Sequence, residues 1–263
     1  MNLGLEGKVA LVAAASRGLG RAIADVLAEE GASLIICART RDAIESARDA
    51  IVQRTGAKVH ALVADVSDPA QLASLSEQAL AKWGRVDVLV TNSGGPPSGP
   101  ADTHDWARWD AAVQLLLRST VELTRAMLPG MRERKWGRII NVTSISVKQP
   151  VESLVLSNSI RAAVTGYART LANEVATDGV TVNCILPGYT RTERVEELAD
   201  ATAAREGLTR AEVVSRFESQ IPMRRLGEPT EFAALAAFLA SEQASYITGQ
   251  SIAVDGGWIR GLF

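Results

Sequence analysis

Two hydroxyls and one guanidinium stand at spacings that would let them act on the same chemical group. Ser144 follows the apolar run that ends at Val142, and Ser157 and then Arg161 come thirteen and seventeen positions after Ser144. Residues four apart share one face of a helix, so Ser157 and Arg161 can point the same way. Both hydroxyls can form hydrogen bonds but are weak acids, whereas a guanidinium stabilises negative charge and stays protonated. The three side chains suit an oxygen atom on which negative charge develops.

The segments that would position these side chains alternate regularly along the chain. Apolar runs of strand length are separated by segments of helical periodicity, which predicts a parallel sheet covered by helices on both faces. The strand-like runs are Val9–Ala13, Ser33–Cys37, Val59–Val63, Val86–Thr91, Arg138–Val142, Val180–Leu186 and Ser251–Val254. The helical segments are Leu19–Glu30, Arg41–Thr55, Pro69–Trp83, Asp105–Glu133, Leu154–Thr177 and Thr230–Ala240. We expect one α/β domain over residues 1–263, a doubly wound parallel sheet of about seven strands.

Composition excludes several classes of function. Hydrophobic residues make up 47% and charged residues 22% of the chain, which predicts a large core and no disorder. The net charge is −2 and no basic block indicates nucleic acid or an anionic membrane. Cys37 and Cys184 lie in apolar runs and are expected to be buried thiols, while His60 and His104 match no metal pattern. With no signal peptide or membrane span, a soluble cytoplasmic protein is expected.

The first strand-like run leads into a loop with two glycines and then an amphipathic helix. Gly18 and Gly20 would allow close approach of a ligand and tight packing of the helix. Backbone N–H groups at the start of such a helix can bind a pyrophosphate, helped by the helix dipole. The alternative is a glycine turn that serves packing alone. The strand–loop–helix context favours a dinucleotide site.

Five segments in the same order resemble motifs of the short-chain dehydrogenase/reductase family, over nearly the whole chain. They are Ala13–Gly20 for Thr-Gly-x-x-x-Gly-x-Gly, Ala64–Val66, Thr91–Gly94 for Asn-Asn-Ala-Gly, Pro187–Thr192 for Pro-Gly-x-x-x-Thr, and Thr248–Gly257. Ala13 and Ala14 replace the Thr and the first Gly of the first motif. The chain is most similar to 3-oxoacyl-(acyl-carrier-protein) reductases within this family. The resemblance implies a Rossmann-type fold, reduction of a carbonyl compound with a nicotinamide cofactor, and a homodimer or homotetramer formed through the two long helices.

The same resemblance implies which residues bind the cofactor. They are Ala14, Ser16, Arg17, Gly18, Leu19, Gly20, Arg39, Asp65, Val66, Asn92, Ser93, Gly94, Arg161, Pro187, Gly188, Thr190 and Thr192. Charge favours NADP over NAD, because Arg17 and Arg39 can bind a 2′-phosphate and the second strand ends without an acidic residue. The alternative is that Arg39 or Arg41 is a solvated residue at the start of the next helix.

The predicted catalytic residues depart from the family pattern. Alignment on that pattern places Ser144 at the catalytic Ser, Ser157 at the proton-donating Tyr, Arg161 at the Lys and Leu116 at the Asn that links the Lys to a water chain. We expect Ser144, Ser157 and Arg161 to form an atypical catalytic site without the Tyr-x-x-x-Lys pair. A leucine in place of the Asn would end any side-chain proton relay at that point.

Three other sources of the proton are conceivable. They are Tyr189, Lys148 and a water held by Ser144 and Ser157. A packing or surface role is the simpler interpretation of each single side chain. Tyr167 lies nearly three helical turns beyond Ser157, which makes it an unsuitable donor.

Two functions remain open at this point. One is an NADP-dependent oxidoreductase acting on a small carbonyl or alcohol substrate, and the other is an NADP-binding sensor or assembly protein without turnover. Residues 189–228 are charged, helix-forming and free of strand-like runs. They are expected to form a lid over the carboxyl ends of the strands, the alternative being an ordinary pair of surface helices.

Overall fold

The computed structural model describes residues 2–262 and contains a seven-stranded sheet whose neighbouring strands all run parallel. The strand order is β3-β2-β1-β4-β5-β6-β7. The strands are β1 Val9–Val12, β2 Ser33–Ala38, β3 Val59–Val63, β4 Val88–Thr91, β5 Gly137–Val142, β6 Val180–Pro187 and β7 Ser251–Val254. The chain reverses its direction of winding between β1 and β4, so the carboxyl ends of these two strands flank the crevice where such folds bind ligands.

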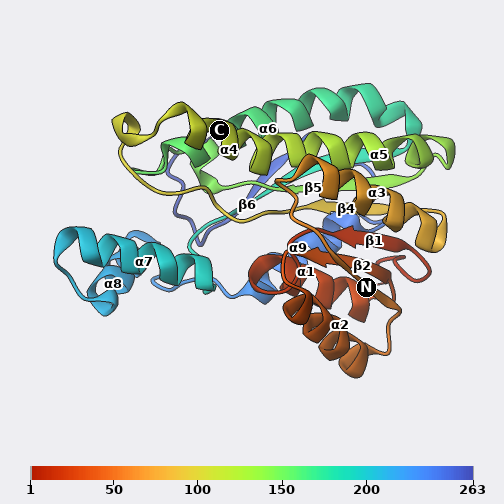
Figure 1. The fold of residues 1–263 in the computed structure, drawn as a ribbon, viewed down its shortest axis with the longest axis horizontal. Coiled ribbons are helices and arrows are strands. Elements are labelled where there is room, and N and C mark those ends of the chain that lie inside the picture. The colour runs from red at the N-terminus through yellow and green to blue at the C-terminus, as the bar shows by residue number, and fades with distance from the viewer. Residues whose placement is uncertain (1, 263) are drawn as a thin grey trace.

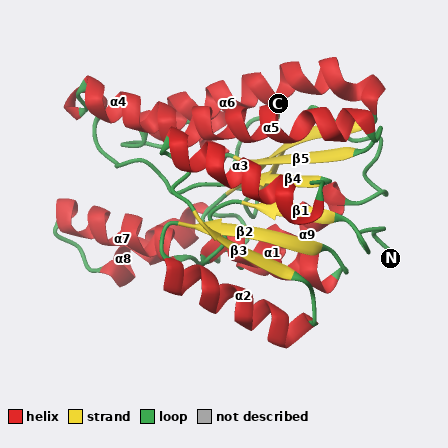
Figure 2. Cartoon of the chain, turned by 45° about the vertical axis from the view of Figure 1, so that its right-hand side comes forward, coloured by secondary structure: helices red, strands yellow, loops and turns green. Residues whose placement is uncertain are grey.

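Helices cover both faces of this sheet (Figures 1 and 2). The helices of the main body are α1 Gly18–Glu29, α2 Arg41–Thr55, α3 Pro69–Trp83, α4 Trp106–Ala112, α5 Ser119–Glu133, α6 Val155–Val175 and α9 Pro229–Ala240. Helices α1, α2 and α9 lie on one face, and α3, α5 and α6 lie on the other. The predicted doubly wound α/β fold is confirmed.

The alternation of side chains along each strand explains why the core has two layers. In β1, Leu11 packs with α3, α5 and α6, whereas Ala10 and Val12 pack with α1 and α9 on the opposite face. Successive strand residues point to opposite faces, so a strand covered on both sides must be apolar throughout. Cys37 and Cys184 are buried as predicted, and burial raises the pKa of each thiol to about 11.

The segment Asp105–Glu133, predicted to be one long helix, is helical without a break from Trp106 to Glu133. The helix is not regular throughout, because a π-helical stretch, Val113–Arg118, lies between α4 and α5. The extra residue per turn of a π-helix rotates the side chains that follow it. Leu116 lies in this stretch and packs against Leu156 and Ile160 of α6, so contact between the two helices accompanies the irregularity.

Residues 189–228 form a helix pair, α7 Glu193–Glu206 and α8 Arg210–Gln220, next to the carboxyl ends of the strands (Figure 1). Val213 and Phe217 of α8 are buried within the core layer that also contains α6. A short parallel bridge between Thr190 and Gly227 closes the base of the segment. Among residues 2–262 no helix has the length and apolar content needed to cross a membrane.

Candidate active site

The glycine loop joins β1 to α1 and is held in a tight conformation. Gly18 has a φ of +58° and Ala14 a φ of 50°, which is strained for a residue with a Cβ. A Cβ on Gly20 would lie 2.3 Å from the carbonyl oxygen of Ala14, so only glycine fits there. Asn92, after β4, supports the loop because its Nδ2 donates to the carbonyl oxygens of Ala13 and Ala14 at 3.3 and 3.4 Å.

The start of α1 has the properties of an anion site. Arg17 precedes the helix without forming a side-chain cap, and the first turn contains no acidic residue. The uncapped N–H groups and the helix dipole are therefore available to a negatively charged group. These residues fit a dinucleotide pyrophosphate. Ser16 and Leu19, also predicted to bind the cofactor, lie in the same loop and first turn.

The adenosine end of the predicted site carries exposed positive charge. Arg39 follows β2 and is exposed, as is Arg17, whose guanidinium also lies 3.9 Å from Glu197 of α7. Asp65 follows β3 and is oriented locally, since its Oδ1 accepts hydrogen bonds from the N–H and hydroxyl of Ser67 at 2.9 and 2.7 Å. Val66 is buried beside it. No acidic residue follows β2 directly.

The loop after β6 lies on the other side of the crevice. The N–H of Gly188 donates to the carbonyl oxygen of Val254 at 3.0 Å, and a Cβ on Gly188 would lie 2.7 Å from the Cα of Asp255. The hydroxyl of Thr192 donates to the carbonyl oxygen of Thr190 at 3.2 Å. Pro187 ends β6, so this predicted group of residues is brought to the carboxyl edge of the sheet.

Arg161 reaches the carboxyl end of β5, where Ser144 lies two residues beyond the strand. The Nη1 of Arg161 donates to the carbonyl oxygen of Val142 at 2.8 Å, two residues before Ser144. The Oγ of Ser144 accepts a hydrogen bond from the N–H of Ser146 at 3.1 Å and begins a 3-10 turn, Ile145–Val147. Its hydroxyl hydrogen thus remains free to be donated to a ligand. Ser157 is partly buried one turn before Arg161 on α6.

The environment of Arg161 is poor in compensating charge. Burial, and after it the cation of Arg194 on α7, lowers the pKa of Arg161 to about 10. Within residues 2–262 no carboxylate forms an ion pair with this guanidinium. A desolvated cation without a partner carries an energetic penalty, which an anionic ligand or transition state can relieve.

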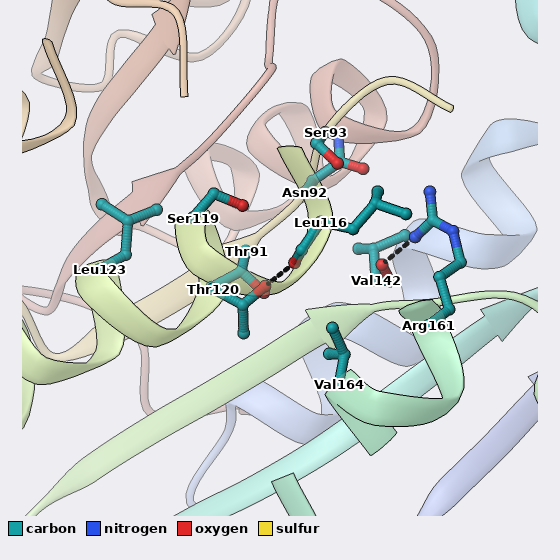
Figure 3. Close-up of a pocket in the computed structure, with 10 residues that line it drawn as sticks. All are labelled: Thr91, Asn92, Ser93, Leu116, Ser119, Thr120, Leu123, Val142, Arg161 and Val164. Carbon is teal, nitrogen blue, oxygen red and sulfur yellow. Dashed lines mark hydrogen bonds between the residues drawn. The ribbon is translucent and has the colours of Figure 1, made fainter. Parts of the chain in front are cut away.

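A cavity of about 10 Å³ lies beside Arg161, and this volume is close to the smallest that holds one water molecule. Its lining residues are Thr91, Asn92, Ser93, Leu116, Ser119, Thr120, Leu123, Val142, Arg161 and Val164 (Figure 3). Leu116 extends toward the Arg161 guanidinium in this view. The hydroxyls of Ser119 and Thr120 donate to the carbonyl oxygens four residues earlier, at 2.6 and 2.9 Å. This wall therefore offers no titratable side chain that could pass a proton to Arg161.

The other conceivable proton donors have different surroundings. Tyr189 stacks on Phe217 of α8 with ring centroids 4.4 Å apart, and burial raises its pKa. Lys148 is exposed beyond the 3-10 turn. Burial also raises the pKa of Tyr167. In the described part of the chain, no group of three or more His, Cys, Asp and Glu side chains could hold a metal ion.

Comparison with known proteins agrees with this geometry. Residues 13–259 match the family model described as "Enoyl-(Acyl carrier protein) reductase". The NADPH-dependent reductase BacG of Bacillus subtilis is 34% identical over 98% of this chain and 100% of its own length. The 3-oxoacyl-[acyl-carrier-protein] reductase FabG of Escherichia coli is 35% identical over 97% of this chain and 98% of its own. The chain belongs to the short-chain dehydrogenase/reductase family.

A solved structure extends this result to three dimensions. The L-sorbose reductase of Gluconobacter frateurii, complexed with NADPH and L-sorbose, matches with a TM-score of 0.94 at 32% identity, over 100% of both chains. Membership in this family makes the protein an oxidoreductase by class. The predicted dinucleotide loop and the Ser144–Arg161 group thus occur within one recognised enzyme fold.

One residue of this site was missed by the sequence analysis. Arg194, in the first turn of α7, donates from Nη2 to the carbonyl oxygen of Pro96 at 3.0 Å and acts on the pKa of Arg161. It comes two residues after Thr192, the end of a recognised motif. That position was the only signal available in the sequence.

Proposed function

We propose that this protein is an NADP-dependent oxidoreductase that reduces a carbonyl, of the 3-oxoacyl type or another ketone, to an alcohol. The observation that carries the proposal is the uncapped, glycine-lined start of α1, which shares one edge of the sheet with Ser144 and Arg161. Relatives named as NADPH-dependent reductases and the L-sorbose reductase complexed with NADPH support the same cofactor. Arg17 and Arg39 favour NADP over NAD because both can bind a 2′-phosphate.

We further propose that the catalytic site is atypical, with Ser157 and Arg161 in place of the Tyr and Lys of the family. When bound, NADPH supplies the hydride. Ser144 donates its free hydroxyl hydrogen to the carbonyl oxygen, and Arg161 stabilises the negative charge that develops there. Arg161 also donates to the ribose hydroxyls. A water held between Ser144 and Ser157 would pass a proton from bulk solvent to the alkoxide, because neither hydroxyl is itself a useful acid near neutral pH.

The lid remains part of this proposal. Helices α7 and α8 adjoin the glycine loop through the Arg17–Glu197 pair and the loop after β4 through Arg194. Residues 189–228 would close over the bound molecules and exclude water from the reaction. Limited proteolysis with and without NADPH tests this closure. Equal cleavage rates within 189–228 under both conditions would show that the segment is an ordinary helix pair.

Consumption of NADPH in the presence of a ketone tests the enzymatic proposal. Ser144→Ala and Ser157→Ala are expected to lower this rate strongly, whereas Ser159→Ala should leave it unchanged because Ser159 is exposed on α6. Titration of cofactor fluorescence measures binding in every variant. Tight binding of NADPH without ketone-dependent consumption would favour the second function, an NADP-binding sensor or assembly protein, which the Ser157 and Arg161 replacements also fit.

The family resemblance also implies a homodimer or homotetramer formed through α5 and α6. Light scattering at micromolar concentration measures this directly. A monomer under those conditions would contradict the expected assembly.

A further inference from the structure

The Arg194 side chain is about half exposed, and its guanidinium is anchored to the loop after β4. Its Nη2 donates to the carbonyl oxygen of Pro96, and a Cβ on Gly95 would lie 2.7 Å from that same nitrogen. Gly95 does not have a positive φ, so its backbone conformation does not require glycine. The missing side chain at position 95 instead provides the space that the guanidinium occupies.

Two guanidiniums, those of Arg161 and Arg194, lie close enough to affect one another electrostatically. Arg161 comes from α6 and Arg194 from α7, and the second cation lowers the pKa of the first. Within residues 2–262 the carboxylate that forms an ion pair with Arg194 is that of Glu197, at 3.6 Å, and both side chains are about half exposed. Such an exposed pair contributes little, and Glu197 also faces Arg17. The positive charge at this point is left largely uncompensated by the protein.

The start of α7 carries side chains of both charges. Glu193 and Glu197 are four residues apart, so they share a helix face. That face adjoins the glycine loop, since Glu193 lies 3.7 Å from a Cβ placed on Gly18 and Glu197 pairs with Arg17. Arg194, which also pairs with Glu197 at 3.6 Å, extends from this turn toward Pro96 and Arg161. The carboxylates thus adjoin the glycine loop, and the guanidinium extends toward the loop after β4.

The loop that holds Arg194 is itself fixed beside α6. The N–H of Gly99 donates to the carbonyl oxygen of Ser153 at 2.8 Å, and Gly99 and Leu154 form a parallel bridge. The loop after β4 consequently contacts both the segment before α6 and the first turn of α7.

We propose that the substrate is a ketone that also carries a carboxylate, and that Arg194 is the specificity-determining residue that binds this carboxylate. This inference rests on the proposed carbonyl reduction and names its substrate class. A planar guanidinium binds a carboxylate through two parallel hydrogen bonds, which fixes the orientation of the carbonyl relative to Ser144. Arg161 adds positive charge behind the same group.

The test compares matched pairs of substrates, each an oxo acid and its methyl ester, in the wild type and in Arg194→Met. The wild type is expected to prefer the acid. Loss of a hydrogen bond to a charged group costs about 1.5–3 kcal/mol, so kcat/KM for the acid should fall about 10- to 100-fold in Arg194→Met, mainly through KM. The rate with the ester and the affinity for NADPH should stay within about twofold, because neither depends on this guanidinium.

Arg191→Met is the matched control. Arg191 is exposed, pairs with Glu228 at 3.1 Å, and lies three residues before Arg194, so its loss removes one charge without altering the mouth of the site. Arg194→Lys should recover only part of the preference for the acid, because an ammonium cannot form the two parallel bonds.

Three results would overturn the proposal. The first is an ester reduced as well as its acid by the wild type, which would leave the reductase proposal intact. The second is a rise in the dissociation constant for NADPH in Arg194→Met with equal losses for acid and ester, which would assign Arg194 to the cofactor. The third comes from calorimetric titration of the oxo acid into the protein–NADP⁺ complex. If Arg194→Met binds the oxo acid as tightly as the wild type does, the carboxylate site is excluded, even if no turnover occurs. If Arg194→Met binds the oxo acid more weakly but neither protein turns it over, the site is retained and the reductase proposal is refuted.

Discussion

The glycine loop at α1 and the Ser144–Arg161 group at β5 adjoin the same crevice, but they depend on different parts of the chain. In the proposed function the loop binds the cofactor through backbone N–H groups, which need little beyond space and a suitable φ, whereas the second group acts through side chains. Ala14, with a φ of 50°, stands where the family motif has a glycine, and the loop is still tight. Ser157 and Arg161 lie one turn apart on α6, where the proposed alignment has the family Tyr and Lys. Backbone geometry thus depends less on residue type than side-chain chemistry does.

The largest expected effect comes from breaking the loop. In Gly20→Ala the new Cβ would meet the carbonyl oxygen of Ala14 at 2.3 Å and Nδ2 of Asn92 at 2.7 Å. Overpacking of this kind costs about 1–3 kcal/mol, and we expect loss of NADPH binding together with a lower Tm. Gly166→Ala is the control, since a Cβ there meets nothing within 4 Å. Unchanged cofactor affinity in Gly20→Ala would refute the assignment of this loop.

Arg161→Met tests the side-chain end of the site. Removing a cation that stabilises developing negative charge is expected to lower kcat by about 100- to 1000-fold. Binding of NADPH should weaken much less, because the loop at α1 is intact. Arg161→Lys should retain part of the activity. Measuring kcat and the dissociation constant for NADPH in each variant compares the effect on catalysis with the effect on cofactor binding. If kcat of Arg161→Met is close to the wild-type value, Arg161 is not a catalytic residue.

Cofactor choice should respond to one side chain beside the loop. Arg39→Asp is expected to shift the ratio of kcat/KM for NADPH and NADH toward NADH by about tenfold or more, since a charged hydrogen bond is worth about 1.5–3 kcal/mol. Arg41→Asp is the control, because Arg41 is exposed and pairs with Glu45 at 3.2 Å within α2. An equal shift in both variants would mean that general surface charge sets the preference.

The smallest effect is expected in the pH profile. A cationic Arg161 is present below its pKa of about 10 and is lost above it. The rate constant kcat/KM should therefore fall as the pH rises through about 10, with no change near neutrality caused by this group. Arg194 is the charged neighbour that acts on this pKa, so Arg194→Met should move the fall to higher pH. If kcat/KM falls at the same pH in Arg194→Met as in the wild type, the fall is caused by a group other than Arg161.

Most of the fold could be predicted from the sequence because its strands are buried on both faces. Helices α2 and α3 begin and end at the predicted residues, and each is followed by a glycine with positive φ, Gly56 and Gly84. The π-helical stretch could not be predicted, since no residue type in Val113–Arg118 marks it. It accompanies packing against α6, which is a contact between distant segments.

The candidate site also contains some features that could be predicted from the sequence and others that could not. Residues adjacent to a strand end, such as Asn92 and Ser144, could be placed because parallel strands bring their carboxyl ends to one edge. The hydrogen bond from Arg161 to Val142 was not predictable, and neither was the approach of Arg194 to Pro96. Both depend on how helices return to the sheet, which local sequence does not specify.

The fit between Gly95 and Arg194 has a consequence for reading related sequences. A side chain at position 95 and a guanidinium reaching from position 194 would compete for one volume, so a larger residue at position 95 would displace the guanidinium from Pro96. Relatives that keep this arginine are expected to keep a glycine ninety-nine residues before it, and relatives with a larger residue there are expected to lack the arginine. The residue types at positions 95 and 194 would then identify a subgroup of the family from sequence alone, before any substrate has been assayed.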